Sequence, residues 1–138
     1  MSLDQRRSRV FVVDDEPVIA STLAAILRIE GFECKSFTRP VEALFAAKCE
    51  TPDLLITDVV MPGMSGIELA LEFERDFQDC KVLLFSGTTS SAKMVEDTRA
   101  FGREFDLLHK PVHPRELVQI VRDLLNTSTA HSSFSRCE

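Results

Sequence analysis

The sequence predicts an α/β protein in which a parallel β-sheet carries helices on both of its faces. Two observations carry this prediction. Five short segments, most of them almost continuously apolar, alternate with longer amphipathic segments. Strands that are buried on both faces of a parallel sheet have this apolar composition. The segments predicted as strands are residues 10–13, 33–37, 54–57, 82–85 and 105–108.

The length and charge of the chain limit its class. A chain of 138 residues fits one domain, and it can bury a core without metal ions or disulfide bonds. Its net charge of −6 argues against general nucleic-acid binding, which usually needs a basic surface. The sequence has no apolar run of about 18 residues, so no membrane span is expected. We therefore expect a cytoplasmic protein that binds neither nucleic acid nor membrane through this chain.

The first helix and the second strand show clear local signals. Proline suits the first turn of a helix and glycine its end, so we expect this helix between Pro17 and Gly31. The second strand, residues 33–37, is half polar, as expected at the edge of a sheet. Apolar residues recur at helical spacing in the first helix, at Ile19, Leu23, Ile26 and Leu27.

The remaining helices are predicted from similar patterns. The second begins at Pro40, and the third follows Gly66. The fourth, at about residues 90–101, has the weakest apolar pattern of the five. The fifth begins near Pro114 and is expected to end near Leu125.

These elements predict three parts of the chain. Residues 9–125 form the domain, and residues 1–8 are expected to be an N-terminal extension, partly of non-native origin. Residues 126–138 are rich in Ser and Thr, a composition typical of a flexible polar tail.

Polar side chains stand where four of the predicted strands end. Asp14 and Asp15 follow the first strand, Asp58 follows the third, Ser86 follows the fourth and Lys110 lies after the fifth. Right-handed crossovers bring the carboxyl ends of parallel strands to one edge of the sheet, where ligands of such proteins bind. The sequence therefore predicts a site with three carboxylates, one hydroxyl and one ammonium group.

These groups suit phosphoryl transfer. Neighbouring carboxylates repel one another, and a divalent cation relieves that repulsion. Oxygen ligands and few carboxylates favour Mg²⁺, with Mn²⁺ as an alternative ion. We expect Asp58 to attack phosphorus as a carboxylate nucleophile, while Lys110 and the ion stabilise the phosphoryl oxygens. Ser86 can donate a hydrogen bond to one of these oxygens.

Four motifs together resemble the signature of response regulator receiver domains. They occur in the expected order and at suitable spacing, and the resemblance covers about residues 9–125. The motifs are Asp14-Asp15-Glu16, the segment from Asp58 to Gly66, Ser86-Gly87 and Lys110-Pro111.

The resemblance implies a flavodoxin-like sheet with strand order 2-1-3-4-5. It implies that Asp15 and Asp58 bind Mg²⁺ directly, with the backbone carbonyl of Val60, and that Asp14 acts on the ion through water. The phosphoryl donor would be a phosphohistidine on a sensor histidine kinase or a phosphotransfer protein. The chain would then be a phosphoacceptor of two-component signalling, not an enzyme beyond its own phosphorylation and dephosphorylation.

The resemblance also implies how the signal leaves the domain. The fourth helix, the fifth strand and the fifth helix would form the output face, which could also join two copies into a homodimer. Receivers often carry Tyr or Phe three residues before the lysine, and that ring turns inward when the hydroxyl of the Ser86 position moves. Here the position is Leu107, so we expect Leu107, with Phe105 on the same face of the strand, to repack instead.

Other functional classes fit the sequence less well. Aspartate-based phosphatases need two acids separated by one residue after the first strand, whereas Asp14 and Asp15 are adjacent. A flavin site needs a phosphate-binding loop there, and the acidic residues would repel the flavin phosphate. A pseudo-receiver that only docks other proteins remains the alternative, although all five site residues are present.

Overall fold

The computed structural model describes residues 7–87, 106–110 and 113–137, and for residues 127–137 it describes the backbone alone. Its centre is a five-stranded sheet of order β2-β1-β3-β4-β5, in which every neighbouring pair is parallel. The predicted α/β class, the parallel sheet and the strand order are confirmed. The strands are β1 (Arg9–Val13), β2 (Glu33–Phe37), β3 (Leu54–Asp58), β4 (Lys81–Ser86) and β5 (Asp106–His109).

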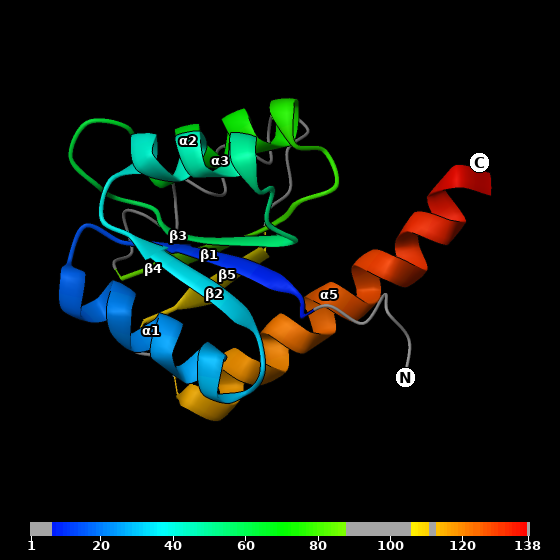
Figure 1. Ribbon diagram of the computed structural model, residues 1–138, viewed down its shortest axis with the longest axis horizontal. Coiled ribbons are helices and arrows are strands. Elements are labelled where there is room, and N and C mark those ends of the chain that lie inside the picture. Colours follow the sequence, from blue (N-terminus) through cyan, green and yellow to red (C-terminus); the bar gives the residue numbers. More distant parts are fainter. Residues whose placement is uncertain (1–6, 88–105, 111–112, 138) are drawn as a thin grey trace.

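Helices cover both faces of the sheet, as predicted. In Figure 1, α2 and α3 lie above the sheet, and α1 and α5 lie below it. The fourth helix predicted at about residues 90–101 lies outside the described residues. The helices are α1 (Pro17–Ile29), α2 (Pro40–Cys49), α3 (Gly66–Asp76) and α5 (Pro114–Cys137).

The sheet separates two hydrophobic cores. Successive side chains on a strand point to opposite faces, so each buried strand supplies both cores. Phe11, Leu55 and Phe73 belong to the core that includes residues of α2 and α3. Ile56 and Leu117 belong to the core that includes residues of α1 and α5. Burial on both faces explains why the central strands are almost continuously apolar.

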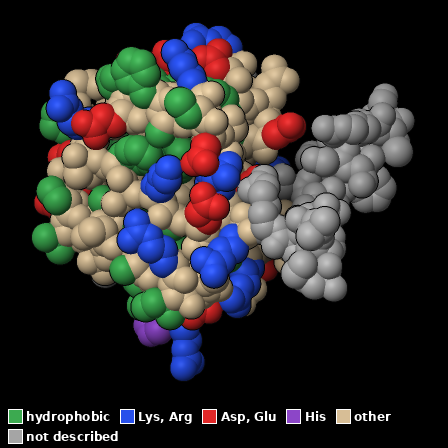
Figure 2. All heavy atoms as spheres, in the orientation of Figure 1, with side chains coloured by type: hydrophobic (Ala, Val, Ile, Leu, Met, Phe, Trp, Pro, Cys, Tyr) green, Lys and Arg blue, Asp and Glu red, His purple; other side chains and the backbone are tan. Residues whose placement is uncertain are grey.

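The edge position of β2 is confirmed. Among the described strands, β2 pairs with β1 alone, and its Lys35 side chain is exposed. Its charged residues form ion pairs with neighbours: Arg9 Nε lies 3.1 Å from Glu33, and Lys35 Nζ lies 3.2 Å from Glu50. Figure 2 shows basic and acidic side chains interspersed over this face of the molecule.

The helix boundaries follow ordinary capping chemistry. Pro17 lies in the first turn of α1, and the helix ends before Gly31, whose φ of +100° favours glycine. Ser65 caps α3: its side chain accepts a hydrogen bond from the backbone N–H of Glu68. The Glu68 side chain accepts one from the backbone N–H of Ser65 in return. This reciprocal cap fixes where α3 begins, next to the carboxyl end of β3.

Helix α5 is longer than the sequence predicts. We expected it to end near Leu125 and a polar tail to follow, but its backbone is helical as far as Cys137. The sequence after Pro114 contains neither proline nor glycine, so it carries no strong signal to stop a helix. In Figure 1 the end of α5 extends beyond the sheet. Among the described residues, no helix combines the length and the apolar composition needed to cross a membrane.

Two phenylalanines on neighbouring helices test the placement of the core. Phe73 is fully buried, whereas Phe45 is 67% exposed. Phe73→Ala leaves a cavity and should lower the free energy of unfolding by about 3–5 kcal/mol. Phe45→Ala should change it by about 0.5 kcal/mol or less. Urea denaturation of both variants measures the difference, and equal effects would contradict this packing.

Candidate functional site

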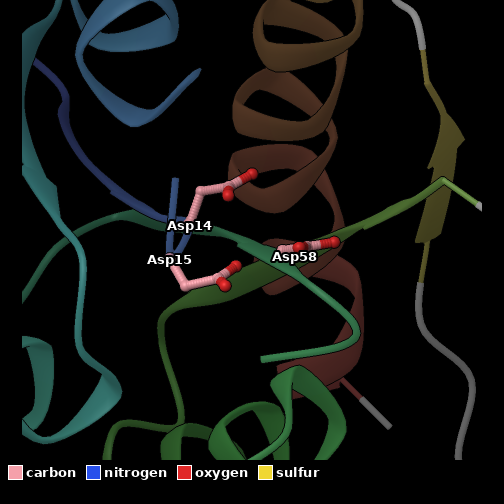
Figure 3. A group of neighbouring side chains, drawn as sticks. All are labelled: Asp14, Asp15 and Asp58. Atoms are coloured by element: carbon pink, nitrogen blue, oxygen red, sulfur yellow. The ribbon is translucent and has the colours of Figure 1, made fainter. Parts of the chain in front are cut away.

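Three carboxylates lie together at the carboxyl ends of β1 and β3 (Figure 3). In the parallel register Val13 lies opposite Thr57, so Asp14 and Asp58 follow at the same edge of the sheet. A side-chain oxygen from each of Asp14, Asp15 and Asp58 can be chosen so that all lie within 4.8 Å of one another. The structure thus brings together the three acids that the sequence singled out.

Ser86 and Lys110 lie at the same edge. Ser86 ends β4 and is buried, and it pairs with His109 in β5. The backbone N–H of Lys110 donates to the carbonyl oxygen of Ser86 (2.8 Å), which continues the ladder by one residue. The Lys110 ammonium reaches back across the sheet, with Nζ 3.0 Å from Asp14 Oδ2 and 3.4 Å from Asp58 Oδ1. All five predicted residues therefore meet at one edge.

The three acids differ in how far their oxygens are already engaged. Asp14 is 1% exposed, and its Oδ1 accepts a hydrogen bond from the backbone N–H of Glu16 (2.9 Å). Its other oxygen accepts the bond from Lys110 (3.0 Å). Asp15 is exposed and Asp58 half-buried. Direct ligation of a cation therefore suits Asp15 and Asp58 better than Asp14.

Burial and charge both act on Asp58. Burial raises the pKa of the Asp58 carboxyl group, the positive charge of Lys110 opposes that rise, and the negative charges of Asp14 and Asp15 add to it. With all groups ionised, three carboxylates and one ammonium carry a net charge of −2. One divalent cation would balance that charge.

The neighbouring acids also keep Lys110 charged. Burial alone would lower the pKa of the Lys110 ammonium group, but the hydrogen bond and charge of Asp14, together with Asp58, more than offset it. The pKa is therefore raised, and Lys110 remains a cation at neutral pH. The sequence did not indicate the pairing with Asp14, because it depends on which way a long flexible side chain turns.

Of the two residues expected to repack on phosphorylation, the structure describes only Leu107. Leu107 is half-buried and packs against the core that includes residues of α2 and α3. Phe105 lies outside the described residues. The Val60 side chain is 56% exposed, two residues beyond Asp58, and the role of its carbonyl group stays a prediction.

One residue of the site was missed by reasoning from the sequence. Gly66 appeared there only as the end of a motif and as the residue before the third helix, but the structure places it directly against the backbone of Asp58. The signal available was the glycine itself, eight residues after Asp58 and immediately before a predicted helix.

The chain is similar to known proteins in both sequence and structure. The family model described as "Response regulator receiver domain" matches residues 10–122. The DNA-binding response regulator MtrA of Mycolicibacterium smegmatis is 33% identical over 120 residues, which cover 87% of this chain and 51% of MtrA. The transcriptional regulatory protein CreB of Escherichia coli is 36% identical over 123 residues, covering 87% of this chain and 52% of CreB.

A solved receiver-domain structure is also similar to this chain. The crystal structure of a response regulator receiver domain protein from Clostridium thermocellum superposes with a TM-score of 0.79 at 25% identity, covering 89% of this chain and 98% of that chain. The chain thus spans about half the length of the curated relatives described, but nearly all of that receiver structure.

The raised pKa of Asp58 predicts how stability depends on pH without metal. Between the ordinary pKa of about 3.9 and the raised folded value, the folded state binds more protons, so rising pH favours unfolding at this group. The stability of Asp58→Asn relative to the unsubstituted protein should therefore increase as the pH rises through this window, then level off.

Urea denaturation in metal-free buffer across this window measures the effect. Asp76→Asn is the control: a hydrogen bond from Arg75 lowers the pKa of Asp76, so its effect on stability changes only below the ordinary pKa and should stay nearly constant across this window. A difference for Asp58→Asn that stays flat would contradict the description of the site.

Proposed function

Because this chain belongs to the response regulator receiver domain family, we propose that it accepts a phosphoryl group on Asp58 in a magnesium-dependent reaction. The observation that carries this proposal is the position of Asp58. Its carboxylate lies 3.4 Å from the Lys110 ammonium and beside Asp14 and Asp15. A nucleophile, a fixed cation and a set of metal ligands thus share one strand-end edge.

The acids fit a hard divalent cation. Asp15 and Asp58 would hold Mg²⁺ directly, the Val60 carbonyl would complete the protein ligands, and Asp14 would act through water. Mn²⁺ could replace Mg²⁺ with the same oxygen ligands. When bound, the ion supplies positive charge to the phosphoryl oxygens during transfer. Both oxygens of Asp14 accept hydrogen bonds, whereas Asp58 meets Lys110 through one oxygen and Asp15 is exposed, and this difference supports the division.

The residues of the chain then perform the transfer. An Asp58 carboxylate oxygen attacks phosphorus, the new oxygen–phosphorus bond forms as the bond to the donor breaks, and the leaving group takes the electron pair. Lys110 is already 3.4 Å from Asp58, so a small movement lets it neutralise a phosphoryl oxygen. The Ser86 hydroxyl, at the end of the neighbouring strand, would donate a hydrogen bond to another phosphoryl oxygen.

The partners follow from the same chemistry. The donor would be a phosphohistidine on a sensor histidine kinase or a phosphotransfer protein. The signal would leave through β5, α5 and the fourth predicted helix, with Ser86 and Leu107, and with Phe105, as the residues that rearrange. The same face would serve a homodimer. We assign no nucleic-acid contact to this chain, since its net charge is −6.

The phosphoryl acceptor is tested directly by a mimic. The protein with Mg²⁺ and beryllofluoride should gain thermal stability, because a ligand that binds only the folded state shifts unfolding. Asp58→Asn should lose the response, and Asp76→Asn, an exposed acid on α3, should keep it. Chelation of the metal should abolish it in every variant. No response in the unsubstituted protein would reject the proposed function and favour a docking module.

Lys110→Ala separates metal binding from transfer. Removing the ammonium takes a competing cation away from Asp58, so Mg²⁺ affinity should rise or hold. Phosphorylation by a small acyl phosphate should slow by about a hundredfold, because a fixed donor to the phosphoryl oxygens is lost. Calorimetry and phosphorylation kinetics measure the two effects. A parallel loss of both would show that Lys110 only maintains the shape of the site.

A further inference from the structure

Gly66 lies where α3 meets the acceptor strand. It is buried at the first position of α3, next to the Ser65 cap. Its backbone N–H donates to the carbonyl oxygen of Val59, and the two atoms are 2.7 Å apart. The start of α3 is therefore bonded to the residue that follows Asp58.

The contact leaves no room for a side chain. A Cβ atom on Gly66 would overlap the carbonyl oxygen of Asp58, and it would lie 2.8 Å from the Asp58 carbonyl carbon and 2.9 Å from Val59 Cα. All three atoms belong to the backbone, so they cannot turn aside as a flexible side chain could. By contrast, a Cβ atom on Gly31 or Gly63 would meet nothing within 4 Å.

The acceptor backbone is held from the other side as well. Asp58 pairs with Phe85 of β4, and the Val59 N–H donates to the carbonyl oxygen of Phe85 (3.0 Å). The hydroxyl of Thr57 also donates to the Asp58 carbonyl oxygen (3.1 Å). The peptide of Asp58 is thus held between β4 and α3, and it can move away from α3 only by straining the sheet.

We propose that Gly66 is a positioning residue for the Asp58 carboxylate. By letting the first turn of α3 rest on the Asp58 peptide, it fixes the backbone from which the nucleophile extends toward Lys110 and Asp15. This inference rests on the proposed phosphoryl transfer and adds a residue to it. It also makes the first turn of α3 and the Asp58 peptide one mechanical unit, so that ordering of one orders the other.

Gly66→Ala tests the proposal, with two controls. Val121→Ala removes buried methyl groups from α5, and Gly31→Ala strains a positive-φ glycine at the end of α1. Both controls lower stability without pressing on Asp58. All variants are compared under conditions where circular dichroism shows them folded.

Gly66→Ala alone should shift the amide resonances of Asp58 and Val59 and weaken beryllofluoride binding by about tenfold or more, since misplacement of a reacting group is costly. Phosphorylation by a small acyl phosphate should slow equally. The controls should match the unsubstituted protein. If folded Gly66→Ala binds the mimic as the unsubstituted protein does, the proposal is overturned.

Hydrogen exchange in the unsubstituted protein decides the matter if Gly66→Ala does not fold. Mg²⁺ with beryllofluoride should slow exchange of the Gly66 N–H, which bonds to Val59, and leave the Glu30 N–H, which bonds to Leu27 at the end of α1, unchanged. No slowing at Gly66 in a protein that binds the mimic overturns the proposal. Failure of the unsubstituted protein to bind the mimic instead overturns the proposed function, and the positioning role with it.

Discussion

The concentration of negative charge at one edge of the sheet is the constraint on which the site depends. Parallel strands end together, and here the ends of β1 and β3 bring three carboxylates within reach of one ion. Lys110 offsets part of that charge through Asp14 and Asp58. The remaining charge and the burial of Asp58 both disfavour its ionised form.

This unfavourable arrangement explains the division of tasks among the residues. Asp14 is buried, and both of its oxygens accept hydrogen bonds. One bond holds the Lys110 ammonium and the other holds the turn after β1. Asp15 is exposed and has room for a hydrated cation. Asp58, at the end of β3, is acted on both by the positive charge of Lys110 and by the negative charges of Asp14 and Asp15.

The fold supplies rigidity where this chemistry needs it. The central strands are buried on both faces, and the ladder of hydrogen bonds continues beyond β3 and β5 into the site. Val59 is bonded to β4, and Lys110 is bonded through its backbone to Ser86. A long lysine side chain therefore starts from a fixed backbone position, which reduces the number of places that its ammonium group can reach.

Much of this could be predicted from the sequence, because it depends on periodicity and on strand ends. Apolar strands and helical spacing gave the α/β class, and the half-polar β2 was placed at an edge. Asp14, Asp15, Asp58, Ser86 and Lys110 were grouped by one rule about parallel sheets. Family resemblance was needed for the strand order, which local patterns do not determine.

The rest depends on contacts that local patterns do not encode. The ion pair between Lys110 and Asp14 joins residues 96 positions apart and depends on side-chain rotamers. The close approach of Gly66 to Asp58 appears only when α3 is packed on β3. Helix α5 continues past Leu125 because the sequence there contains no proline or glycine that would end a helix. The Ser- and Thr-rich composition alone had suggested a flexible tail.

The central claim is that the phosphoryl group is carried by Asp58. After reaction with a small acyl phosphate and Mg²⁺, borohydride reduction converts a phosphorylated aspartate to homoserine, which peptide mass spectrometry can locate. The account predicts homoserine at position 58 and at no other acidic residue. Homoserine at Asp14 or Asp15, or an unmodified chain, would contradict it.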